Sequence, residues 1–250
     1  MSGHSKWHSI KHQKGVTDAR RGQLFTKLTK EIIIAAREGG GSPDANFRLR
    51  LAIQKARDAN MPMDNIERAI KKGTGELEGG SLVELTLEGY GPNGIAILVN
   101  ALSDNRNRAI QEVRSTFTRH GGSLGEAGCV AWMFDSKGSI RLKPGDYDPD
   151  ELALSLIDAG AEDVNADDDQ VEIVTAPENL MAVREAIEAM NIEVESSEVE
   201  MVPKTMIELD DKSAGQALKL MEKLEEIDDV QNVYSNADIS EEAAEAYQAS

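Results

Sequence analysis

The chain has 250 residues, of which 40% are hydrophobic and 29% are charged, and its formal net charge is −18. This length allows two or three domains that each bury a core. The apolar runs of the sequence are far shorter than the roughly 20 residues needed to cross a bilayer, so no membrane span is predicted. The single cysteine excludes a disulfide framework within the chain. Together with the absence of a targeting signal, it favours a cytoplasmic protein.

The first 75 residues differ sharply in charge from the rest of the chain. They hold 15 of the 27 Lys and Arg residues but only 7 of the 45 Asp and Glu residues, a formal charge of +8 against −26 for residues 76–250. Binding to phosphate depends on local charge and counterion release, so an acidic average does not exclude a nucleic-acid partner. Residues 1–75 are therefore predicted to form a domain made of a basic arm and a helical bundle.

The arm, residues 2–16, has no apolar period and contains a tryptophan among cations. Trp7 is placed to stack on an exposed base of structured or single-stranded RNA, or alternatively to anchor the arm on the bundle. His4, His8 and His12 would share one face of a helix, but no carboxylates support them as metal ligands. We therefore predict neither a metal nor a cofactor.

Three helices are predicted after the arm. A 3.6-residue period places apolar side chains on one side of 19–37 and cations on the other. Ser42 is predicted to cap a second helix over 43–59, with a proline in its first turn. A third, short helix begins at Pro62 and ends near Gly73.

From residue 81 the apolar period changes to two, which indicates strands. Strands are predicted over 82–87 and 95–102, joined by the turn GYGPNG. The glycines match GxGxxG, but a dinucleotide site needs a helix after this motif and here a strand follows. A nucleotide site is not predicted.

The segment LSDNRNR precedes a helix that is predicted to run to about residue 119, with Asp104 as its cap. Arg106 and Arg108 then lie in the first turn, where they oppose the helix dipole unless they meet an anion. That anion is either a bound phosphate or a surface carboxylate of the protein. A third strand is predicted over 129–134.

The order of elements in residues 136–203 is βαββαβ, which is typical of a ferredoxin-like domain. The segment 204–239 supplies the helix and strand that the sheet of residues 81–135 lacks. The predicted fold is thus α+β and multidomain: an N-terminal three-helix bundle and two α/β (ferredoxin-like) domains. The acidic domain 136–203 is inserted in the middle domain, 81–135 with 204–239.

No nucleophile, acid–base pair or phosphate-binding loop stands out, so an enzyme is not expected. The candidate nucleic-acid contacts are the basic and aromatic residues of the arm and first helix, with two arginines as a second region. They are Lys6, Trp7, Lys11, Lys14, Arg20, Arg21, Lys27, Lys30, Arg106 and Arg108.

Several motifs together resemble the YebC family, whose mitochondrial relative is the translational activator of cytochrome c oxidase. They are GHSKW, GGGSPDAN, EGYGPNG, LSDNRNR and GGSLGEAGCV. The resemblance implies a three-domain, cytoplasmic, non-enzymatic regulator that binds DNA to control transcription. The alternative that it implies is a ribosome-associated factor that relieves stalling at proline-rich stretches, with ribosomal RNA as its partner. A small-molecule enzyme is a second alternative and would need a deep pocket with convergent polar groups. The oligomeric state is not predicted.

Overall fold

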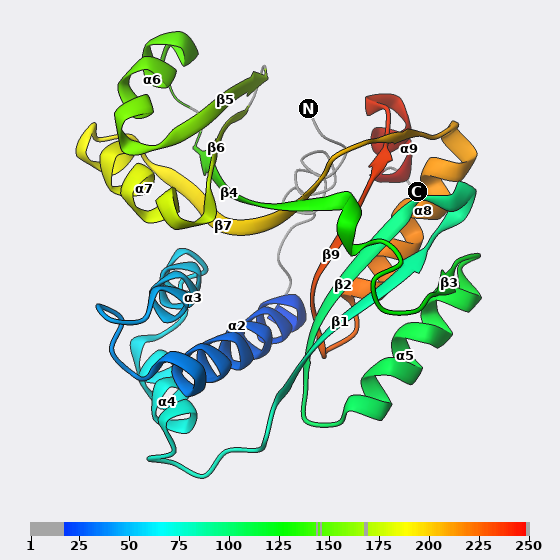
Figure 1. Cartoon of the computed structure of the whole chain (residues 1–250), viewed down its shortest axis with the longest axis horizontal. Helices are drawn as coiled ribbons and strands as arrows, with labels where there is room; N and C mark the ends of the chain where they lie inside the picture. Colours follow the sequence, from blue (N-terminus) through cyan, green and yellow to red (C-terminus); the bar gives the residue numbers. More distant parts are fainter. Residues whose placement is uncertain (1–17, 144, 146, 168–169, 249–250) are drawn as a thin grey trace. The chain divides into compact units, whose positions relative to one another are not determined.

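The computed structural model describes residues 18–248 except 144, 146, 168 and 169 (Figure 1). The chain divides into two compact units. Of the described residues, unit 1 comprises those in 18–34, 78–135 and 202–248, and unit 2 comprises those in 35–77 and 136–201. The predicted three-domain boundaries stay a prediction: this division assigns the segment 18–34 and the segment 35–77 to different units.

Unit 1 is built on a four-stranded sheet of order β3-β1-β2-β9. β1 and β2 pair antiparallel along their whole length, from Val83 opposite Ser103 to Tyr90 opposite Ala96. β9 pairs with the other side of β2, so the C-terminal segment completes this sheet as predicted. The elements are β1 (Val83–Tyr90), β2 (Ala96–Ser103), α5 (Arg106–Arg119), β3 (Ser123–Leu124), β8 (Ile207–Glu208), α8 (Asp211–Glu225), β9 (Val230–Ser235), β10 (Ala237–Asp238) and α9 (Glu241–Gln248).

The core of unit 1 lies between one face of this sheet and the apolar faces of its helices. Ile97 and Val99, two residues apart on β2, point to the same face and pack with Phe117 of α5 and Leu218 of α8. All four are buried. The turn between β1 and β2 takes the left-handed conformation at Asn93 (φ 56°) and at the glycine after it. The predicted hairpin is therefore present.

Unit 2 contains the predicted ferredoxin-like domain. Its sheet order is β5-β6-β4-β7, which is the strand order that a βαββαβ chain forms when each helix crosses over one strand. Its elements are β4 (Phe134–Leu142), α6 (Pro149–Leu156), β5 (Ala161–Asp167), β6 (Gln170–Thr175), α7 (Leu180–Ala189) and β7 (Val194–Pro203). Apolar residues of α6 and α7 bury one face of the sheet.

The helices α3 (Phe47–Asp58) and α4 (Met63–Thr74) also belong to unit 2. Ion pairs connect α3 to the acidic segments of the ferredoxin-like domain. Lys55 lies 2.9 Å from Glu198, and the buried Arg184 of α7 contacts Asp58 at 3.0 Å. Glu198 thus neutralises a cation of α3, whereas in the second pair the cation belongs to the ferredoxin-like domain and the carboxylate to α3.

Helix α2 (Asp18–Gly39) is joined to α3 by a turn centred on one asparagine. The buried Asn46 caps α3, because its Oδ1 accepts from Leu49 N at 3.0 Å. Its Nδ2 donates to the carbonyl oxygens of Ala35 (2.7 Å) and Gly40 (2.8 Å) at the end of α2. The predicted cap at Ser42 and the predicted helix start at residue 43 are wrong, because residues 43–45 form a turn that closes on the Ser42 carbonyl.

The loop after β3 also differs from expectation. Residues 129–134 were predicted to be a strand, but 131–133 form a 3-10 turn and the strand begins at Phe134. Glu88 causes this difference, because its buried carboxylate accepts backbone N–H bonds from Gly128 (2.6 Å), Val130 (2.7 Å) and Ala131 (2.7 Å). Burial alone would raise the pKa of Glu88, but these three bonds outweigh it and hold the pKa below its usual value.

We expect Asn46→Ala to lower the free energy of unfolding by about 1–3 kcal/mol, since it removes a helix cap and leaves two carbonyl oxygens without their donor. Urea unfolding followed by circular dichroism measures the change. The matched control is Ser42→Ala, which alters an exposed side chain in the same turn and should leave the midpoint unchanged. Equal losses in both variants would contradict the cap assigned to Asn46.

Candidate nucleic-acid interface

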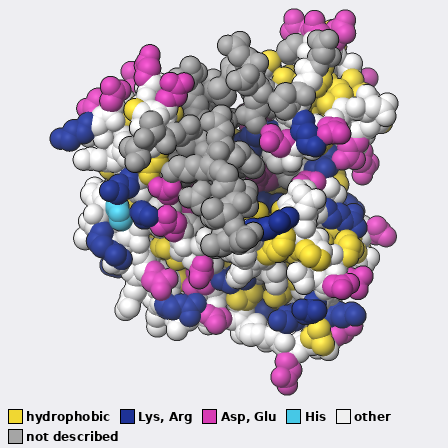
Figure 2. Space-filling model, turned by 180° about the vertical axis from the view of Figure 1, so that it is seen from behind, with side chains coloured by type: hydrophobic (Ala, Val, Ile, Leu, Met, Phe, Trp, Pro, Cys, Tyr) yellow, Lys and Arg dark blue, Asp and Glu magenta, His cyan; other side chains and the backbone are white. Residues whose placement is uncertain are grey.

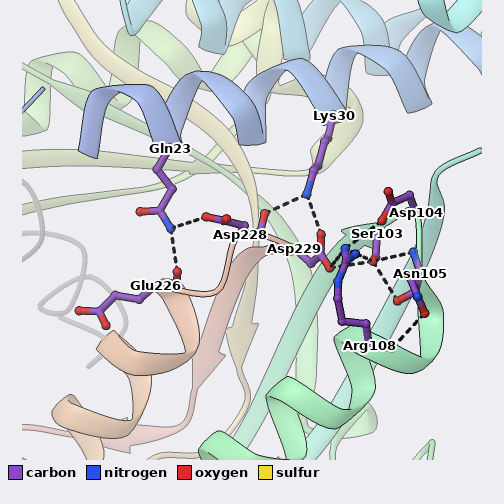
Figure 3. Close-up of polar contacts among 9 residues, drawn as sticks. All are labelled: Gln23, Lys30, Ser103, Asp104, Asn105, Arg108, Glu226, Asp228 and Asp229. Carbon is purple, nitrogen blue, oxygen red and sulfur yellow. Dashed lines mark hydrogen bonds and ion pairs between the residues drawn. The ribbon is translucent and has the colours of Figure 1, made fainter. Parts of the chain in front are cut away.

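Two of the predicted basic residues of α2, Lys27 and Lys30, contact an acidic segment of unit 1, Glu225–Asp229, which joins α8 to β9. Figure 3 shows the contacts of Lys30. Gln23, Lys27 and Lys30 follow one another at spacings of four and three, so they lie on one face of α2. Gln23 Nε2 donates to Glu226 O at 2.7 Å, and Lys27 Nζ donates to Glu225 O at 2.6 Å. Both acceptors are carbonyls at the end of α8, where the helix dipole is negative and favours cations.

The buried carboxylate of Asp229 is the centre of this contact. Its Oδ1 accepts from Lys30 Nζ at 2.8 Å, and its Oδ2 accepts from Ser103 Oγ at 2.7 Å and from Arg108 Nη2 at 2.8 Å. The Asp229 side chain is 4% exposed. Burial by itself would raise the pKa of Asp229, but the bonds from Lys30, Arg108 and Ser103 outweigh it, so the pKa lies below its usual value.

The segment LSDNRNR builds the α5 side of this network. Asn105, and not the predicted Asp104, caps the helix: its Oδ1 accepts from Arg108 N at 3.1 Å. The Arg108 side chain reaches back to Asp104 at 2.8 Å as well as to Asp229. Of the two anions considered from the sequence, Arg108 therefore meets carboxylates of the protein itself. These carboxylates raise the pKa of Arg108 further above neutrality, chiefly through the hydrogen bond with Asp229.

A cleft of about 630 Å³ opens beside the network. Three cations line it, Lys30, Arg108 and Arg119. Five carboxylates also line it: Asp104, Glu112, Glu226, Asp228 and Asp229. The surplus of negative charge does not suit a polyanion, and the polar groups include no nucleophile with an adjacent base. Among the described residues, no group of three or more metal-ligating side chains comes together.

The remaining candidates fall into two groups. Lys6, Trp7, Lys11 and Lys14 lie outside the described residues, as does the side chain of Arg20. Arg21 is exposed, and its guanidinium carbon lies 5.9 Å from the centroid of the Phe25 ring. Arg106 is exposed at the start of α5. The structure thus brings Lys27, Lys30 and Arg108 together, and it brings them to one acidic segment.

The sequence analysis missed the acidic segment itself. Its signal is a run of four carboxylates in five residues at the carboxyl end of a helix, where negative charge opposes the dipole. Such a run is favourable only where cations meet it. The arginines at the start of α5 oppose the dipole of their helix in the same way.

We expect Asp229→Asn to destabilise unit 1 by about 1–3 kcal/mol at neutral pH, because the amide cannot neutralise Lys30 and Arg108. The pKa of this carboxyl is lower in the folded protein, so its contribution is complete above the ordinary Asp value of about 3.9 and is lost as the pH falls through the lowered value. The difference between wild type and variant should therefore shrink in acid.

Urea midpoints measured at several pH values test this. The control is Asp104→Asn, which removes the more exposed carboxylate that pairs with the same arginine and should shift the midpoint far less. A difference that grows as the pH falls would contradict the role of Asp229.

Among the described residues, no helix is both long enough and apolar enough to cross a membrane. The structure resembles the crystal structure of a conserved hypothetical protein from Aquifex aeolicus, with a TM-score of 0.84 and 47% sequence identity over 93% of this chain and 96% of that one. A protein of Dehalococcoides mccartyi named "Probable transcriptional regulatory protein" is 58% identical over 99% of this chain and 98% of its own length. A protein of Geobacter sulfurreducens with the same description is 56% identical over 98% and 99%.

Two family models match consecutive parts of the sequence. The model described as "TACO1/YebC protein N-terminal domain" matches residues 5–76, and that described as "TACO1/YebC second and third domain" matches residues 82–237. The resemblance inferred from the motifs is therefore confirmed. This chain belongs to the TACO1/YebC family.

Proposed function

We propose that this protein is a non-enzymatic regulator of gene expression that binds nucleic acid through its first 75 residues. The observation that carries the proposal is the separation of charge, +8 in residues 1–75 and −26 in the remainder. The names of its relatives support a role in transcription. Binding through phosphate contacts needs a local excess of cations, which the rest of the chain does not supply.

The described residues show which cations are already bound within the protein, and this narrows where nucleic acid could be contacted. On the face in Figure 2, Lys and Arg side chains lie singly or in small groups among Asp and Glu. Lys27, Lys30 and Arg108 are already held by carbonyl or carboxylate oxygens of unit 1. A phosphate that binds Lys30 or Arg108 must therefore compete with Asp229. We propose that the first contacts are made by the arm and by Arg21 and Arg106.

The test is the salt dependence of binding. We expect Lys6→Gln/Lys11→Gln to weaken binding to duplex DNA and to lower the slope of log K against log salt by about 1.8, since each phosphate contact contributes about 0.9. The matched control is Lys212→Gln/Lys219→Gln, two exposed lysines of α8 with the same change in net charge. Equal affinities and slopes for both double variants would refute the proposal that the arm binds nucleic acid.

Two further binding assays distinguish duplex DNA from the ribosome as the target. A regulator of transcription should prefer particular duplex sequences over random ones by well more than tenfold at physiological salt, as is typical of specific DNA binding. A translation factor should instead cosediment with ribosomes and lose this association when residues 2–16 are deleted. Both assays are carried out in one buffer, because affinities at different salt concentrations cannot be compared.

A further inference from the structure

The indole of Trp132 is strongly exposed although the backbone that carries it is firmly held. Trp132 lies in the 3-10 turn between β3 and β4, and the residue is 64% exposed. A tryptophan carries a large apolar surface that is usually buried at least in part. Leaving most of it in water has a cost, so its exposure needs an explanation from either folding or binding.

The turn that carries the ring is fixed by several groups besides the ring. The buried Glu88 holds three backbone N–H groups on one side, including that of Ala131. On the other side, Lys204 N donates to Met133 O at 2.8 Å and Lys204 Nζ donates to Trp132 O at 3.0 Å. The backbone is thus fixed before any partner arrives, which lowers the entropy cost of binding through this side chain.

The polar atom of the indole is already used within the protein. Trp132 Nε1 donates to the carbonyl oxygen of Cys129 at 3.1 Å, and the hydroxyl of Tyr90 donates to the same oxygen at 3.1 Å. This hydrogen bond fixes the ring, and it leaves no indole N–H to donate a hydrogen bond to a partner. What remains available is the flat π surface, which suits a partner that stacks rather than one that forms hydrogen bonds.

The surroundings of the ring favour a nucleobase over an apolar protein surface. Lys204 and Asp135, an ion pair at 3.2 Å with side chains 49% and 58% exposed, lie beside this turn. Protein interfaces usually centre on a continuous apolar patch, and here an aromatic ring stands next to charged groups. An aromatic ring near a lysine is the arrangement that binds unpaired nucleotides, the ring to the base and the cation to the phosphate.

We infer that Trp132 is a stacking platform for an unpaired nucleobase, forming a second contact with nucleic acid apart from the arm. The inference rests on the proposed function and specifies it, because a base can reach the ring only where a strand is unpaired. The phosphate of the stacked nucleotide would compete with Asp135 and the Trp132 carbonyl oxygen for the neighbouring Lys204. The arm then supplies sequence-independent attraction, and the platform favours single-stranded or looped segments.

The chain permits a direct measurement, since it has only two tryptophans, Trp7 and Trp132. In the full-length Trp7→Phe variant all tryptophan fluorescence comes from Trp132, while an aromatic ring is kept in the arm. We expect a 12-nucleotide oligouridylate to quench this fluorescence on binding. A blunt 12-base-pair duplex should bind without quenching it.

Affinity gives an independent readout. In the Trp7→Phe background, Trp132→Ala should weaken binding of the oligouridylate about tenfold or more, as is typical for the loss of one stacked base, while Trp132→Phe should retain most of the affinity. Binding of the blunt duplex should not change in either variant. The matched control is Val83→Ala, another exposed apolar residue of unit 1, which should bind both probes as before.

The outcomes separate this inference from the proposed function. If the oligouridylate binds without quenching and Trp132→Ala binds as tightly as its parent, the stacking platform is refuted while binding through the arm stands. If the parent protein binds neither probe, the proposed function itself fails. Unfolding midpoints of the Ala and Phe variants show whether a loss of affinity arises from unfolding, and a loss in the Ala variant at an unchanged midpoint supports stacking.

Discussion

Unit 1 depends on one buried carboxylate that three elements share. Asp229 brings together α2 through Lys30, α5 through Arg108 and the end of β2 through Ser103. A buried ionised group is tolerated only when its charge is matched and its lone pairs are used, and here both conditions hold. It is the carboxylate to which Lys30 of α2 and Arg108 of α5 both donate. The acidic body of the protein therefore has a structural role, which is to hold the basic helix.

The same principle recurs in unit 2. Arg141 is almost completely buried and donates to Glu172 at 3.1 Å and to Glu200 at 2.9 Å. Burial raises the pKa of Glu200 above its usual value, and the charge of Arg141 counteracts part of that rise. Together with the pairs that α3 makes, this shows that the excess of Asp and Glu is partly consumed inside the fold. Pairs inside residues 76–250 leave their net charge of −26 unchanged, because that sum already counts Arg141, whereas Lys30 and Lys55 from residues 1–75 offset part of it.

Much of the fold could be predicted because its signals are local. The change of period from 3.6 to 2 near residue 81 and the βαββαβ order each depend on neighbours in sequence, and both are confirmed. The errors involve partners distant in sequence or a competing cap. A strand was predicted over 129–134 because nothing nearby shows that Glu88, some 40 residues earlier, takes up the backbone N–H groups of this loop. Asn46 is the cap of α3 in place of Ser42, because its side-chain amide also donates hydrogen bonds to two carbonyl oxygens at the end of α2.

The candidate site was the hardest part to predict. Lys27, Lys30 and Arg108 are predicted from their charge. Charge alone does not distinguish a side chain that binds phosphate from one that meets a carbonyl or carboxylate oxygen about 120 to 200 residues away. The exposure of the Trp132 indole could not be predicted for a related reason. An apolar run such as GCVAWMF is typical of a buried strand. Whether a residue in such a run is buried depends on the fold of the loop.

The backbone bond between Lys204 and Met133 has a consequence for the history of this architecture. It joins the two points at which the chain leaves unit 1 for residues 136–201 and returns from them, so the start of β4 and the end of β7 lie side by side. A segment whose ends are adjacent can be gained or removed in a single genetic event without rethreading the sheet that hosts it. Residues 136–201 leave and rejoin the rest of the chain at one place, and all four strands of the sheet β3-β1-β2-β9 lie outside them.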